Sequence, residues 1–99
     1  MGFDVDTGRL RRIAASCEQQ ADHYDNRRRT LAQRCESLQG TWTGVSAQGF
    51  QNISSQWINS TQHTVNELRS IARKLRDLAE HYDRLDREER ARKKRKKND

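Results

Sequence analysis

The sequence predicts an all-α fold, an antiparallel two-helix hairpin that dimerises into a four-helix bundle and carries a flexible basic C-terminal tail. The chain has 99 residues, no proline and only five glycines, a composition that favours long helices. A seven-residue repeat of apolar positions occurs twice, and a short glycine-containing segment separates the two runs. Hydrophobic residues make up only 31% of the chain, which is little material for a self-sufficient core, so we expect a partner to cover the apolar stripes.

The first repeat predicts a helix over residues 7–39, preceded by an N-terminal extension over residues 1–6. Asp6 or Thr7 is the expected N-cap. Positions a and d of a heptad face the neighbouring helix. The a positions are Thr7, Ala14, Ala21, Arg28 and Cys35, and the d positions are Leu10, Cys17, Tyr24, Leu31 and Leu38.

A turn is expected over residues 40–45, where Gly40 and Gly44 bracket Trp42, and a second helix over residues 46–86. Its a positions are Ala47, Ser54, Thr61, Leu68, Leu75 and Tyr82, and its d positions are Phe50, Trp57, Thr64, Ile71, Leu78 and Leu85. The next column, e, holds Ile58, Val65, Ala72 and Ala79, and we expect this surplus column to face a partner. The residues predicted to pack in the hairpin or its dimer are Leu10, Tyr24, Leu31, Leu38, Phe50, Trp57, Leu68, Ile71, Leu75 and Leu78.

The position of the turn predicts the register of the hairpin. Helices that pair around Trp42 bring together residues whose numbers add up to about 84, such as Leu31 with Ile53 and Cys17 with Leu68. The segment from Glu80 onward then overhangs the first helix.

Polar residues occupy the middle layers of the predicted hairpin: Arg28, Ser54, Thr61 and Thr64. They are either a poorly packed waist or a device that fixes register and partner choice.

Composition and spacing exclude several classes of protein. Cys17 and Cys35 on one helix would lie about 27 Å apart, too far for a disulfide, and we interpret them as reduced core residues. The three histidines share no ligand pattern, so no metal or cofactor is expected. No nucleophile–base spacing or phosphate loop indicates an enzyme. No apolar stretch approaches the ~20 residues of a membrane helix, and no signal peptide begins the chain, so we expect synthesis in the cytoplasm.

The last thirteen residues, 87–99, carry eight basic and three acidic side chains and hold most of the formal charge of +6. The core of this basic tail is Arg92, Lys93, Lys94, Arg95, Lys96 and Lys97. One interpretation is a solvated helix end without a ligand. An acidic protein or an anionic membrane surface is favoured over nucleic acid, because no aromatic residue is interleaved to stack on bases.

These features together resemble the WXG family of small proteins exported by bacterial type VII secretion systems. The resemblance rests on Trp42-Thr43-Gly44 at the predicted turn, the chain length, and the Tyr-x-x-x-Asp pattern from Tyr82 to Asp86. It implies a non-enzymatic protein, secreted or displayed at the cell surface, that pairs with itself or with a related chain. It also implies a composite secretion signal of Trp42, Gly44, Tyr82 and Asp86, which the secretion ATPase reads in the dimer.

Two alternatives remain open. The first is a cytosolic helical adaptor that pairs with a larger type VII toxin, and the second is a nucleic-acid-associated helical dimer that uses the basic tail. Trp42 also has a purely structural interpretation, as a plug at the end of the bundle.

Overall fold

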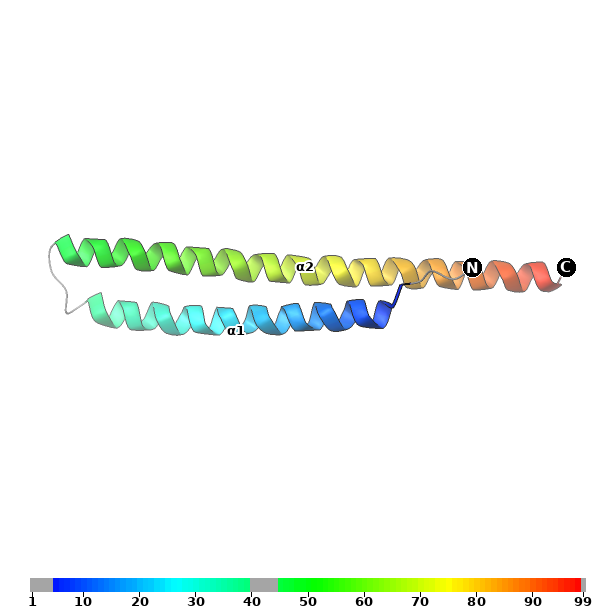
Figure 1. The fold of residues 1–99 in the computed structure, drawn as a ribbon, viewed down its shortest axis with the longest axis horizontal. Coiled ribbons are helices and arrows are strands. Elements are labelled where there is room, and N and C mark those ends of the chain that lie inside the picture. The colour runs from blue at the N-terminus through cyan, green and yellow to red at the C-terminus, as the bar shows by residue number, and fades with distance from the viewer. Residues whose placement is uncertain (1–4, 40–44, 99) are drawn as a thin grey trace.

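Two long antiparallel α-helices form the molecule in this computed structural model, which describes residues 5–39 and 45–98 (Figure 1). Helix α1 spans Thr7–Gln39 and helix α2 spans Val45–Asn98. They lie side by side in a rod with extents of 83 × 16 × 15 Å. The described residues contain no strand. The predicted all-α hairpin is therefore confirmed, while its dimerisation stays a prediction.

Helix α1 begins where the sequence predicts, and Asp6 is its N-cap. The Asp6 carboxylate accepts a hydrogen bond from the backbone N–H of Arg9 at 2.9 Å, which satisfies a donor that the first turn leaves unpaired. The backbone N–H of Leu10 donates to the carbonyl of Asp6 at 3.1 Å. Helix α1 is described as far as Gln39, and the segment 40–44 lies outside the described residues.

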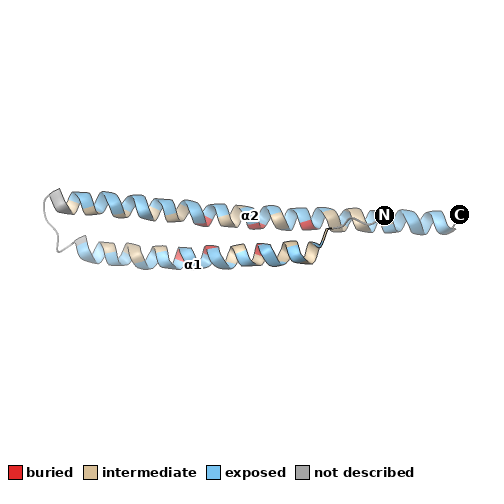
Figure 2. Ribbon diagram, in the orientation of Figure 1, coloured by how far each residue is buried: buried red, intermediate tan, exposed pale blue. Residues whose placement is uncertain are grey.

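The seam between the helices is built from small side chains. Ala14 and Ala21 of α1 face Val65, Ala72 and Ala79 of α2, and all five are completely buried. Figure 2 shows these buried residues along the facing sides of the two helices. Small side chains let two helices approach closely.

This seam corrects one expectation about α2. The e column, expected to be surplus, forms the inner contact, whereas the d column lies largely outside it: Trp57, Ile71 and Leu78 are exposed. The physical reason is side-chain size, because the alanines at a in α1 and at e in α2 allow the helices to approach more closely than large residues at d do. The large d side chains are therefore displaced to one flank of the seam.

The overlap between the helices extends farther along α2 than predicted. Arg11 near the start of α1 forms an ion pair with Asp83 at 2.7 Å, three residues past Glu80, where the overhang of α2 was expected to begin. Helical side chains lean toward the N-terminus of their own helix. In an antiparallel pair, a side chain of α1 therefore contacts a residue of α2 that lies farther toward the C-terminus than the residue opposite its own Cα. The residue numbers of the ion pairs between the helices add up to 91–94, above the predicted 84. Closer to the turn, Leu31 and Ile53 line one groove.

Helix α2 also continues to Asn98, so the expectation that the second helix ends near residue 86 is wrong. Ion pairs one turn apart support the helix, Asp86 with Arg90 at 3.0 Å and Glu89 with Lys93 at 3.6 Å. Basic side chains fill its last turn, where they interact favourably with the helix dipole. Arg, Lys, Glu and Ala are moreover good helix formers.

Candidate partner-binding face

The exposed large apolar side chains of the described residues all belong to two heptad positions. Position d follows a by three residues, and position g directly precedes a. These side chains are Ile13, Tyr24, Leu38, Ile53, Trp57, Ile71 and Leu78. Ile13 and Ile53 are at g and the other five are at d. We call the surface formed by the d columns of both helices, together with Ile13 and Ile53, the apolar face.

The two helices contribute to the apolar face on the same side of the rod. In an antiparallel pair that packs through positions a and e, the d and g columns of both helices project to the same flank. A groove of about 390 Å³ confirms this near the turn, where both helices line it. Its lining residues are Leu31, Cys35, Phe50, Ile53, Ser54 and Trp57.

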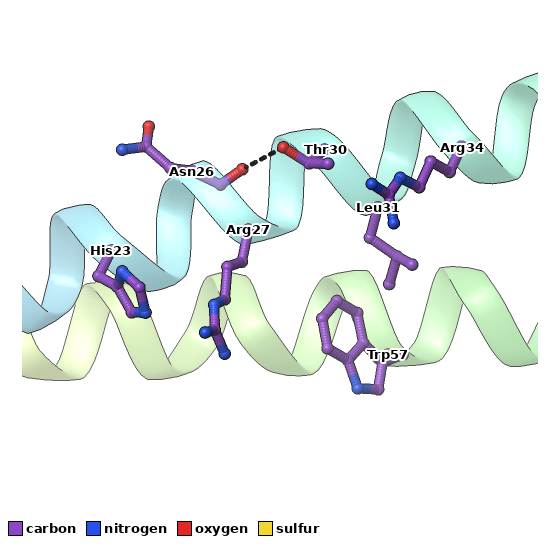
Figure 3. A pocket seen from close by; sticks show the side chains of 7 residues that line it. All are labelled: His23, Asn26, Arg27, Thr30, Leu31, Arg34 and Trp57. Atoms are coloured by element: carbon purple, nitrogen blue, oxygen red, sulfur yellow. Dashed lines mark hydrogen bonds between the residues drawn. The ribbon is translucent and has the colours of Figure 1, made fainter.

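A second depression, of about 400 Å³, adjoins this groove and is rimmed by cations (Figure 3). Leu31 points from α1 toward the indole ring of Trp57, which closes the bottom of the depression. Arg27 and Arg34 of α1 also line it, and neither has an ion pair within residues 5–39 and 45–98. The remaining lining residues are His23, Asn26 and Thr30. A partner side chain with an apolar stem and a carboxylate end fits this combination of surfaces.

The opposite flank of the rod is polar and joins the helices by ion pairs. Arg69 pairs with Asp22 at 3.3 Å, and Arg76 pairs with Glu18. The Arg76 guanidinium donates a hydrogen bond to Glu18 and lowers the pKa of that carboxyl. All of these residues occupy positions b or e. The hairpin therefore has one charged flank, occupied by its own ion pairs, and one apolar flank without a cover.

Asp25 lies at the centre of a charged cluster that the heptad reasoning did not single out. It is only 7% exposed, and Arg28 binds its carboxylate through Nε at 3.1 Å and through Nη2 at 2.9 Å. Arg29 lies 3.0 Å and Arg69 3.9 Å from the other oxygen. The hydrogen bonds from Arg28 and the surrounding positive charge lower the pKa of Asp25.

This cluster accounts for Arg28, the residue that interrupts the apolar a column of α1. Its guanidinium does not lie unpaired in the seam but pairs with Asp25 one turn earlier. Of the other polar layers, Thr61 and Thr64 donate to backbone carbonyls one turn back, at 3.0 and 3.2 Å, and Ser54 does the same. The i, i+3 spacing of Asp25 and Arg28 is the feature of the sequence from which this pair could have been predicted.

The structure describes two of the four predicted secretion-signal residues. Trp42 and Gly44 lie outside the described residues, between the end of α1 and the start of α2. Tyr82 lies on α2 toward the other end of the hairpin, half-buried, with its ring edge-on to that of His81 at a centroid distance of 5.8 Å. Asp86 lies one turn further along and binds Arg90.

The other predicted packing residues fall into two sets. Leu10, Leu68 and Leu75 are half-buried beside the seam, as are Leu31 and Phe50 near the turn. Tyr24, Leu38, Trp57, Ile71 and Leu78 belong to the apolar face and remain exposed in the single hairpin. Ile53, which the predicted register placed opposite Leu31 but which was not among the predicted packing residues, is 69% exposed, the most of the described large apolar side chains.

Other kinds of site find no support in the part of the chain that the structure describes. No group of three metal-ligating side chains occurs there. None of the described helices is long and apolar enough to cross a membrane. Cys17 and Cys35 are free and half-buried on the same helix.

Fold and surface together define a class of protein, a helical hairpin with one uncovered apolar flank. The chain matches the family model WXG100, described as proteins of 100 residues with WXG, over residues 2–87. It belongs to this family, as the sequence features had indicated. Neither a curated protein nor a solved structure matches the chain in the corresponding comparisons.

Proposed function

We propose that this chain works as a dimer of hairpins and is exported by a bacterial type VII secretion system. WXG100 proteins are small helical proteins linked to secretion, and they typically form dimers with related chains. The observation that carries the proposal is the gathering of every exposed large apolar side chain of the described residues on one flank. A second hairpin that covers this flank completes a four-helix bundle.

The area and shape of the apolar face suit a hairpin partner. The face follows both helices from Ile13 and Leu78 at one end to Leu38 and Ile53 at the other. A small ligand would cover a fraction of it, whereas a second rod of the same length covers all of it. The partner is a second copy of this chain or a related chain with a matching apolar flank.

The proposed secretion signal depends on how the two hairpins are oriented. Within one hairpin, Trp42 lies in the segment between α1 and α2, whereas Tyr82 lies far along α2. An antiparallel dimer brings the turn of one hairpin beside Tyr82 and Asp86 of the other. We infer that the secretion ATPase binds this composite surface, so the dimer and not the single chain is recognised.

The test is export of variants that keep the dimer. Trp42→Ala, Gly44→Arg and Tyr82→Ala are expected to abolish or strongly reduce secretion while the purified proteins still sediment as dimers. Asn52→Ala, on the outer side of α2, serves as the matched control and should be exported normally. Export of all three signal variants at the wild-type level would reject the composite signal.

The cytosolic adaptor is the second candidate, because a larger toxin with a helical targeting domain could cover the same apolar face. Both candidates use this face, so only the fate of the chain distinguishes them. Appearance of the protein in the culture medium without a larger partner supports export in its own right. Retention in the cell, with recovery in a complex with a larger chain, supports the adaptor.

A further inference from the structure

The basic end of α2 has a feature that export of a hairpin dimer does not use. We call residues 87–97 the basic helix segment; all but its first residue lie beyond the family match, which ends at residue 87. The structure shows a continuous helix here, where the sequence indicated a flexible tail. From Arg90 to Lys97 the segment has seven cations and no carboxylate.

Most of these cations have no ion pair with the residues that the structure describes. Arg90 and Lys93 pair with Asp86 and Glu89 of the preceding turn. The remaining five have no ion pair within the described residues, and every one of them is exposed. They are Arg92, Lys94, Arg95, Lys96 and Lys97. The helix thus carries five positive charges that no ion pair within residues 5–39 and 45–98 neutralises.

The arrangement of these cations around the helix distinguishes between anionic partners. Successive residues of a helix point about 100° apart, so a continuous run from Arg92 to Lys97 places cations on every side. Beyond Ala91 there is no apolar side chain, so the segment lacks the apolar face that inserts into a lipid interface. A flat membrane meets only one side of such a helix. The major groove of a nucleic acid duplex encloses a helix on several sides at once.

The spacing of the charges also matches a duplex. Eight helical residues from Arg90 to Lys97 span about 12 Å, and a DNA duplex presents about seven phosphates over the same length of its axis. Continuous basic helices that enter the major groove are an established way of binding DNA. The lack of aromatic residues disfavours stacking on single strands, but a groove-bound helix has no need of them.

We propose that the basic helix segment binds duplex DNA in the major groove through phosphate contacts, without base specificity. This activity is separate from the proposed export, because it uses a part of α2 that α1 does not cover. The helix is essential to the proposal, since it fixes the cations at a spacing that a flexible tail would not hold.

The test is fluorescence anisotropy of the full-length protein with a labelled 20-bp duplex of mixed sequence over a range of salt concentrations. Five to seven phosphate contacts predict that log K falls against log salt with a slope of about −4.5 to −6, since each contact contributes ~0.9. The triple variant Lys94→Gln, Arg95→Gln, Lys96→Gln should lower the affinity at least tenfold and flatten the slope by about 2.7. Arg9→Gln, Arg12→Gln, Arg73→Gln removes the same charge from exposed sites on the hairpin and should leave both values unchanged.

A second variant tests the role of the helix. Ala91→Pro keeps every charge but breaks the helix at the start of the cationic run, and it should weaken duplex binding at least tenfold. Wild-type binding by Ala91→Pro would overturn the proposal, as would equal losses in the two triple variants. Vesicles of phosphatidylglycerol and phosphatidylcholine form the third arm. Tighter binding to these vesicles than to the duplex at equal salt would replace DNA by a membrane as the partner.

Discussion

Ile53 offers a quantitative test of the apolar face, because it is 69% exposed in the single hairpin. Ile53→Ala removes three carbon groups, each worth about 0.8 kcal/mol when fully buried. If a partner buries the exposed share, the loss is about 1.7 kcal/mol for each copy of the residue at the interface. Alanine is also the better helix former, so α2 itself is not weakened.

The size of the effect reports what the partner is. One copy at the interface predicts a Kd that rises about 16-fold, whereas a homodimer has two copies and predicts a rise of about 250-fold. Sedimentation equilibrium over a dilution series measures the Kd, for the chain alone and with any related chain. Asn52→Ala, the exposed neighbour on the outer side, should leave the Kd unchanged. A Kd for Ile53→Ala within twofold of the wild type would refute the assignment of this face.

Three further outcomes follow from the seam and the charges. The pKa of Asp25 is lowered in the folded state, so the ionised carboxylate stabilises the fold fully above the unfolded pKa of about 3.9. This contribution is lost as the pH falls through and below that value. Asp25→Asn should therefore reduce the loss of unfolding free energy at acid pH, measured by urea titrations from pH 7 to 3. Ala72→Leu adds volume to a fully buried site and should destabilise the hairpin by about 1–3 kcal/mol in chemical denaturation. Ala91→Leu, on the exposed end of α2, should be nearly neutral. Equal effects of the two variants would show that Ala72 does not lie in a tight seam. Arg34→Glu reverses a charge at the rim of the apolar face and should change the salt dependence and the association rate of the dimer in stopped-flow measurements, while Arg73→Glu on the outer side should not.

The seven-residue repeat was sufficient to predict both helices and their antiparallel pairing. It was sufficient because the pattern is local, and because the absence of proline leaves the helices uninterrupted. The repeat also placed Leu31 with Ile53, since the position of the turn fixes their register.

The choice of seam was not predictable from the repeat alone. Columns a, d and e of α2 are all largely apolar, and only packing against Ala14 and Ala21 decides which of them lies inside. Two small residues on α1 favour the small residues Ala72 and Ala79 opposite them, so the larger d residues are displaced outward. Side-chain volume across the pair, and not hydrophobicity along one helix, sets this outcome.

The helical state of the basic segment was missed for a different reason. A run of like charges indicates repulsion and disorder when it is considered by itself. Here the run continues a long helix, so no nucleation is required, and two acidic residues one turn earlier offset part of the repulsion. The context of the segment thus outweighs its composition.

The distribution of apolar volume supports the proposal that this hairpin associates with a partner. Among the described residues, the fully buried apolar side chains are four alanines and one valine, and such small groups remove little apolar area from water. The ion pairs on the charged flank lie at a partly exposed surface, where each contributes little to stability but favours one register over others. The large side chains that could contribute most to stability lie on the apolar face. We therefore expect folding within one chain to arrange this surface and association with a second chain to bury it.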